Sequence, residues 1–215
     1  MTARASVAVA DLHGRLDLLD QLLATFPDRH FVFLGDLTDR GPDSPGVVAR
    51  VRELVVAGRA QLCLGNHDQM LIDAVCRQNG VMQDFWLSNG GTPEQWVSLE
   101  ALRADAEWIE RTALPWLVEG PVLFAHAMRP SPADPNAHLW GRPADTPLYP
   151  LPDGVTVSVH GHTPMNACPF PVGLEDGTVA WFIDTGAFRT GKLCVFDCDT
   201  MRPVIITLPA LAPSP

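Results

Sequence analysis

One stretch of the chain joins an apolar strand pattern to a cluster of polar residues, and it reads Phe31-Val32-Phe33-Leu34-Gly35-Asp36-Leu37-Thr38-Asp39-Arg40-Gly41. Its first four residues are apolar and are followed by glycine, which is typical of a short buried strand. Acidic and basic side chains stand where that strand would end. The stretch therefore predicts a strand over His30–Leu34 whose carboxyl end carries chemically active residues.

Two further strand patterns end in the same way. Ser6–Ala10 ends at Asp11, and Ala60–Leu64 ends just before Gly65 and Asn66. Parallel strands joined by right-handed crossovers bring their carboxyl ends to one edge of a sheet, where ligands gather. We therefore expect the polar residues at these three strand ends, 25 and 30 positions apart along the chain, to be neighbours in space.

Helical patterns lie between these strands. Arg15–Phe26 carries apolar residues at helical spacing. A loop from Gly41 leads to a second helix, for which Ser44 is the expected N-cap and Pro45 the first helical residue. Strand and helix thus alternate through the first third of the chain, which predicts an α/β fold.

The rest of the chain departs from this alternation. Residues 70–117 are helix-like, hold four of the six tryptophans, and are interrupted by a turn at Ser88–Pro93. We expect them to form a helical cap over or beside the site, with the tryptophans mainly in its core. Residues 128–154 are rich in Pro and Asp and are predicted to be a long functional loop. Strands are expected again at Pro121–Ala125, Val155–His160, Val179–Asp184, Lys192–Asp197 and Val204–Leu208.

Composition sets the class of protein. The 215 residues are 47% apolar, which suits one domain, here placed at residues 1–208 with a short tail at 209–215. A net charge of −10 argues against broad nucleic-acid binding.

No segment approaches the roughly 18 apolar residues of a membrane span, and no signal-peptide core precedes the first motif. Five cysteines without a Cys-x-x-Cys pair predict reduced thiols in a cytoplasmic protein. The oligomeric state is left open.

Five short motifs follow in order along the chain. They are Asp11-Leu12-His13-Gly14, Gly35-Asp36-Leu37-Thr38-Asp39-Arg40-Gly41, Gly65-Asn66-His67-Asp68, Ala125-His126-Ala127 and Gly161-His162-Thr163. As an ordered set they resemble the calcineurin-like metallophosphoesterases over residues 7–193. The Asp-Arg-Gly ending of the second motif is similar to the phosphoprotein phosphatase-type branch. The resemblance implies a calcineurin-like metallophosphoesterase fold, a two-sheet α/β/β/α sandwich with a helical cap segment.

The resemblance also implies a site for two divalent metal ions. Asp11 and His13 match ligands of one ion, Asp36 matches a bridge between the two ions, and Asn66, His126 and His162 match ligands of the other. Mixed nitrogen and oxygen ligands suit Mn, Fe or Zn, of which Mn is our first expectation. In relatives of this kind a hydroxide between the two ions attacks phosphorus directly, without a phosphoenzyme.

Further residues match catalytic and substrate-binding positions of that family. His67 matches a histidine that protonates the leaving oxygen, and Asp39 matches its carboxylate partner. Arg40 matches a phosphate-binding arginine. A second such arginine is expected after His126, and we prefer Arg142 to Arg129.

Two departures from the pattern bear on substrate choice. Asp68 stands where related protein phosphatases commonly have Glu, and Met128 follows Ala-His-Ala where His-Ala-Gly is frequent. His160 lies two positions before the last motif, but strand alternation could direct it either way, so it has no assigned role.

Three functions are compatible with these residues. The first is a metal-dependent phosphatase for phosphate monoesters, with phosphoserine and phosphothreonine in proteins as the favoured substrates. The second is a symmetrical hydrolase of dinucleoside polyphosphates such as diadenosine tetraphosphate. The third is a binding scaffold without catalysis, which would be expected to have lost a metal ligand or His67, whereas all of them are present.

Overall fold

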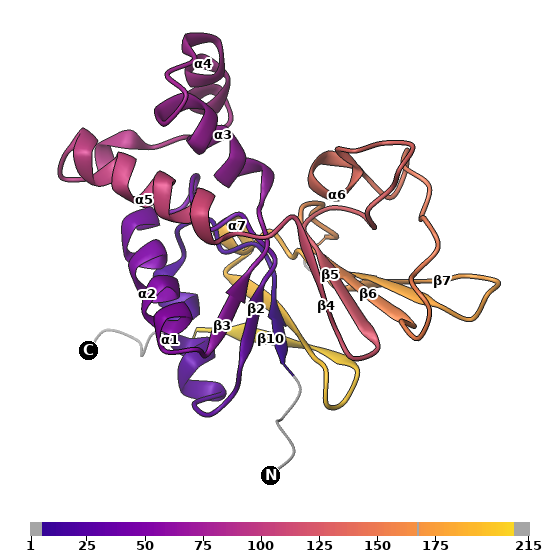
Figure 1. Ribbon diagram of the computed structural model, residues 1–215. Coiled ribbons are helices and arrows are strands. Elements are labelled where there is room, and N and C mark those ends of the chain that lie inside the picture. Colours follow the sequence, from indigo (N-terminus) through magenta and orange to yellow (C-terminus); the bar gives the residue numbers. More distant parts are fainter. Residues whose placement is uncertain (1–5, 167, 209–215) are drawn as a thin grey trace.

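The computed structural model describes residues 6–166 and 168–208, which form two mixed sheets with helices around them (Figure 1). The first sheet consists, in spatial order, of β10 (Arg202–Thr207), β9 (Lys192–Asp197), β1 (Val7–Val9), β2 (Phe31–Phe33) and β3 (Ala60–Leu62). The second consists of β4 (Trp116–Glu119), β5 (Val122–Ala125), β6 (Val157–His160), β8 (Val179–Phe182) and β7 (Phe170–Gly173). The predicted two-sheet α/β fold is confirmed.

Strand direction determines where the motifs meet. In the first sheet β1, β2 and β3 are parallel, and β9 pairs antiparallel with β1. In the second sheet β5, β6 and β8 are parallel, with β4 and β7 antiparallel at the two edges. Every predicted motif follows the carboxyl end of a parallel strand, so each sheet presents its motifs at one end.

Two helices connect the parallel strands of the first sheet. These are α1 (Leu16–Thr25) and α2 (Ser44–Val56), and both lie along the same side of that sheet (Figure 1). The predicted N-cap of α2 was wrong, because the carboxylate of Asp43 accepts a hydrogen bond from the Gly46 N–H. Ser44 is instead the first helical residue, and its hydroxyl accepts a hydrogen bond from the Asp39 N–H.

Helices also fill the middle of the chain. They are α3 (Asn66–Val75), α4 (Gly80–Ser88), the 3₁₀ turn η1 (Pro93–Gln95) and α5 (Leu99–Thr112), and they lie above one end of the first sheet (Figure 1). Helix begins four residues earlier than expected, at Asn66. It also ends earlier, because Trp116 and Leu117 belong to β4 and not to a helix.

Apolar packing joins the two sheets. The main core cluster contains Val9 and Phe33 from the first sheet together with Phe124 and Val159 from the second, each with 0% of its surface exposed. A smaller cluster, which includes Ala137 of the single-turn helix α6 (Ala137–Trp140), covers part of the second sheet. Within the described residues, no helix has the length and apolar character needed to cross a membrane.

Candidate active site

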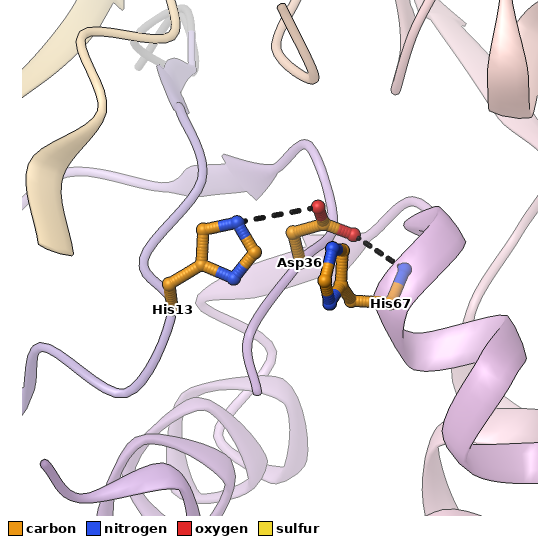
Figure 2. Close-up of side chains that lie close together, drawn as sticks. All are labelled: His13, Asp36 and His67. Atoms are coloured by element: carbon orange, nitrogen blue, oxygen red, sulfur yellow. Dashed lines mark hydrogen bonds and ion pairs between the residues drawn. The ribbon is translucent and has the colours of Figure 1, made fainter. Parts of the chain in front are cut away.

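Asp36 lies between imidazoles that come from different sheets. It follows β2 and is 1% exposed. Its Oδ2 lies 3.5 Å from Nε2 of His13, which follows β1 in the first sheet. Its Oδ1 lies 3.4 Å from Nε2 of His126, which follows β5 in the second sheet. The two oxygens of one carboxylate therefore face donors on opposite sides, and Figure 2 shows the His13 side of this arrangement.

Backbone carbonyls set the proton positions of these two imidazoles. The Nδ1 of His13 donates to the Thr38 carbonyl at 2.8 Å, and that of His126 donates to the Leu34 carbonyl at 2.9 Å. A carbonyl can only accept, so Nδ1 carries the proton, and in the neutral ring Nε2 keeps a lone pair close to Asp36. Burial, followed by the charge of other histidines, holds the pKa of both imidazoles well below the usual range. Both rings are therefore neutral and suited to binding a cation.

Asn66 completes the donor group on the second-sheet side. Its Oδ1 lies 2.9 Å from Nε2 of His126 and 2.9 Å from Nδ1 of His162, which follows β6. The ligand atoms of Asp36, His126 and His162 all lie within 4.8 Å of one another. Burial, with a smaller contribution from the Arg142 guanidinium, lowers the pKa of His162 to about 3. This group matches the residues predicted for one metal ion.

Asp11 ties the two sheets together at the same place. Its carboxylate oxygens accept hydrogen bonds from the His162 N–H at 3.1 and 3.0 Å. A Cβ at Gly161 would lie only 2.0 Å from Asp11 Oδ1, so this approach requires glycine. Burial, followed by the charges of Asp184 and Asp36, raises the pKa of Asp11 well above its usual value. Clustered buried carboxylates of this kind favour a bound cation.

The donor set fits divalent metal ions. Neutral imidazole nitrogens, an amide oxygen and buried carboxylates are ligands for borderline and hard divalent cations. A second group, His13, Asp36 and His67, has its candidate ligand atoms within 4.8 Å of one another and shares Asp36 with the first. Asp11 belongs to neither group, although it lies against His162.

His67 has a partner that sets its protonation. It lies in the first turn of α3, and its Nδ1 is 2.7 Å from Oδ2 of Asp39, which is fully buried. Its backbone N–H donates to Asp36 Oδ1 at 2.9 Å (Figure 2). Burial alone would lower the pKa of His67, but the Asp36 charge and the Asp39 hydrogen bond more than offset it, so the pKa is raised. The ring therefore holds its second proton more readily than a free imidazole, and His67 lines the cavity described next.

Of the three arginines considered from the sequence, Arg40 and Arg142 line a cavity at the site, and Arg129 does not. A cavity of about 70 Å³ is lined by Asp36, Arg40, Asn66, His67, Asn89, Trp140, Arg142 and His162. Arg129 is not among these residues. Instead its buried guanidinium donates to Ser158 Oγ, the Tyr149 carbonyl and Thr178 Oγ1. Arg40 also reaches His13, with 2.8 Å between its NH1 group and the ring Nε2.

Two buried carboxylates near the site were not predicted from the sequence as site residues. Asp68 accepts hydrogen bonds from the N–H groups of Asp36, Leu37 and Gly65, so it shapes the loop that carries Asp36. Asp184 follows β8 at the same sheet end and accepts from the Gly186 N–H at 2.7 Å. The position of Asp184 at the end of a predicted strand was the sequence signal that could have identified it as a site residue. Burial raises the pKa of Asp68 to about 7 and that of Asp184 to about 6.

His160 lies outside both donor groups. Its ring stacks on Phe182 with centroids 5.2 Å apart, and its Nδ1 lies 3.1 Å from the Ala125 carbonyl. Its neighbours are therefore packing partners from the second sheet.

Left-handed backbone is concentrated at the site. Among the described residues, eight other than glycine have positive φ, and five of these are predicted site residues: His13, Asp36, Asp39, Arg40 and His162. Each such residue costs on the order of 1–3 kcal/mol and persists only where its surroundings enforce it. Strain gathered on chemically active side chains is typical of a functional site.

Comparison with known proteins agrees with this geometry. Residues 6–166 match the family described as calcineurin-like phosphoesterase. The chain is 32% identical over 205 residues to a protein named serine/threonine-protein phosphatase 1 from Salmonella typhimurium, covering 86% of this chain and 88% of that one. It is 46% identical over 66 residues to a symmetrical bis(5'-nucleosyl)-tetraphosphatase from Ralstonia nicotianae, covering 30% of this chain and 23% of that one.

A solved structure resembles the fold over nearly its whole length. It is described as a candidate diadenosine tetraphosphatase, with a TM-score of 0.68 and 18% identity, covering 98% of this chain and 96% of that one. At this identity the likeness concerns the fold alone. The family match spans most of the chain and includes the Asp36 loop and the His67 helix, so this chain belongs to the calcineurin-like phosphoesterase family.

Proposed function

We propose that this protein is a metal-dependent phosphatase that hydrolyses phosphate monoesters, with phosphoserine and phosphothreonine in proteins as its substrates. The observation that carries the proposal is Asp36, whose two oxygens face His13 at 3.5 Å and His126 at 3.4 Å. A carboxylate shared in this way suits two ions held side by side. The similarity to serine/threonine-protein phosphatase 1 over 86% of the chain supports the choice of substrate.

In this proposal the residues divide between two metal positions. His13, Asp36 and Asp11 would hold one divalent ion, and Asp36, Asn66, His126 and His162 would hold the other. When bound, such ions activate water and neutralise charge on the phosphoryl group. Manganese is the first ion to test, followed by iron and zinc.

The chain's own side chains supply proton transfer and substrate binding. Asp39 accepts from His67 Nδ1–H, which leaves Nε2 as the atom that delivers a proton to the leaving oxygen. Arg40 and Arg142 both line the cavity and are suited to bind phosphoryl oxygens through paired N–H donors. Neither role requires a covalent intermediate on a cysteine or serine.

A panel of substrates tests this proposal. With Mn²⁺ present, we expect hydrolysis of phosphoserine and phosphothreonine peptides and of nitrophenyl phosphate, and we expect a chelator to abolish it. Released phosphate is measured at matched protein concentration, with added Mn²⁺ restoring activity after chelation. Hydrolysis of diadenosine tetraphosphate with peptides left intact would contradict the peptide assignment while leaving the phosphoesterase chemistry in place.

The second candidate, a symmetrical dinucleoside polyphosphate hydrolase, is favoured by one feature of the cavity. Trp140 lines it, is 38% exposed, and lies 6.2 Å from the ring of Phe85 between centroids. An exposed aromatic pair beside a phosphate site can stack on a nucleobase. The symmetrical tetraphosphatase from Ralstonia nicotianae shares 46% identity over a short stretch.

Replacing the two rival arginines separates substrate binding from folding. Arg142→Ala is expected to raise KM about tenfold or more without lowering the melting temperature, because Arg142 lines the cavity and is exposed. Arg129→Ala is expected to lower the melting temperature, because Arg129 is buried and its removal leaves the buried Ser158 hydroxyl and the Tyr149 carbonyl without this donor. Steady-state kinetics and thermal unfolding check both. The reverse pattern would make Arg129 the substrate residue.

A further inference from the structure

Trp86 of α4 approaches the site from the far side of Asp39. It is 1% exposed, and its indole Nε1 lies 2.9 Å from Oδ1 and 3.0 Å from Oδ2 of Asp39. Oδ2 is also the atom that pairs with His67 Nδ1 at 2.7 Å. A single line of contacts therefore runs from the helical segment through Asp39 to the imidazole.

The segment that follows Trp86 holds this contact in place. A Cβ at Gly91 would lie 2.5 Å from Trp86 Cε2, so the backbone there packs closely against the indole ring. The carbonyl of Gly90 accepts a hydrogen bond from the Arg40 N–H at 3.0 Å. Residues 86–91 thus contact both Asp39 and Arg40, whose φ values are 74° and 66°. The helical segment therefore helps to hold both residues in their left-handed backbone conformation.

Asp39 needs this donor for a physical reason. It has no exposed surface, and an ionised carboxylate buried in protein requires hydrogen-bond donors. His67 supplies one donor to Oδ2, and the indole N–H supplies another that both oxygens share. Without the indole, the carboxylate could rotate about its terminal bond, because that torsion has a broad minimum. The imidazole would then lose the contact that orients its ring.

We propose that Trp86 is a positioning residue for the leaving-group step: its indole N–H fixes the Asp39 carboxylate, which in turn aims His67 Nε2 at the departing oxygen. This inference rests on the proposed phosphatase function. Trp86 touches neither substrate nor metal in this scheme and acts entirely through Asp39.

The test compares two tryptophans of the same helical region. Trp86→Phe keeps a large aromatic ring and removes the N–H. Trp96→Phe is the matched control, because Trp96 is 7% exposed and its Nε1 donates to Asp105 Oδ2 at 2.8 Å, away from Asp39. On phosphoserine peptide, Trp86→Phe is expected to lower kcat about tenfold with little change in KM, as for loss of one charge-assisted hydrogen bond. On nitrophenyl phosphate the loss is expected to be smaller, and Trp96→Phe should leave both rates unchanged.

A double-mutant cycle shows whether Trp86 acts through Asp39. In an Asp39→Asn background, Trp86→Phe should cost little further activity, because the contact it supports has already been altered. Equal losses from Trp86→Phe and Trp96→Phe, or independent multiplication of the Trp86→Phe and Asp39→Asn losses, would overturn the proposal.

Two further measurements keep the test decisive. If Trp86→Phe does not fold, Gly91→Ala, which would push on the indole ring, should give the same leaving-group dependence. Nuclear magnetic resonance can follow the Trp86 indole proton, which should move when Asp39 is changed to Asn and stay when Asp105 is changed to Asn. If the Trp86 resonance does not move in the Asp39→Asn protein, the positioning role of Trp86 is overturned, while the proposed phosphatase function still stands. A wild-type protein that is inactive on every phosphoester overturns the proposed function as well.

Discussion

Replacing Asp36 with Asn is expected to lower turnover by at least about a thousandfold and to release bound metal, because one side chain serves both donor groups. Asn is almost the same size, but it lacks the negative charge and offers a single acceptor oxygen where Asp36 faces both His13 and His126. Elemental analysis after gel filtration measures metal content, and phosphate release measures turnover.

Asp184→Asn provides the matched control for this experiment. Asp184 is a buried carboxylate at the same sheet end, yet it is absent from both donor groups. We expect the Asp184→Asn protein to retain most of its metal. If Asp36→Asn kept full metal content and full activity, the assignment of Asp36 as a shared ligand would be wrong.

Replacing His67 with Asn is expected to leave metal content unchanged and to lower kcat on a phosphoserine peptide by roughly 10²–10⁴-fold, the usual effect of removing a general acid. The loss should be much smaller on nitrophenyl phosphate, since its leaving oxygen is acidic and needs little protonation. The raised pKa of His67, in which Asp36 and Asp39 overcome the effect of burial, agrees with a ring that carries the proton.

The comparison of alkyl and aryl substrates also distinguishes His67 from its neighbours. Asp39→Asn should act in the same direction but more weakly, since Asp39 only supports the imidazole. Arg40→Ala should raise KM and lower kcat with little dependence on the leaving group. Equal losses on both substrates for His67→Asn, or the loss of a metal ion, would show that His67 is not the leaving-group acid.

Strand-end motifs made the centre of the site predictable from the sequence. The strands before Asp11 and Asp36 are continuous apolar runs, and the strand before Asn66 is apolar except for Gln61. Parallel strands with helical crossovers leave little choice about where their ends meet. His126 and His162 follow β5 and β6 by the same rule in the second sheet. The roles of these residues as ligands remain predictions for the experiments above.

Edge strands were not predictable in this way. β7 contains Phe170 and Pro171, is largely exposed, and has no alternation of buried and exposed positions to signal a strand. β4 begins at Trp116, which is 41% exposed and continues what looked like a helical apolar pattern. It pairs with β5 across the two-residue turn Gly120-Pro121, a hairpin signal that the helical interpretation of residues 70–117 missed.

Local chemistry also left some choices open. Asp43 and Ser44 are both good caps, and only the Asp39 loop, which occupies the Ser44 hydroxyl, decides between them. Arg129 and Arg142 are both close in sequence to His126. The guanidinium of Arg129 donates to the buried Ser158 and to the half-buried Tyr149 and Thr178, which lie 20 to 49 residues away along the chain.

The order of strands in the first sheet has a consequence for biosynthesis. β1 lies between β2 and β9, so one of its edges stays unpaired until residues 192–197, more than 180 positions later, leave the ribosome. Exposed strand edges invite pairing with other chains. The donor group around Asn66 likewise waits for His162. While residues 10–191 are being made, a nascent chain therefore has one exposed edge of β1, and it is vulnerable to aggregation through that edge until β9 pairs with it.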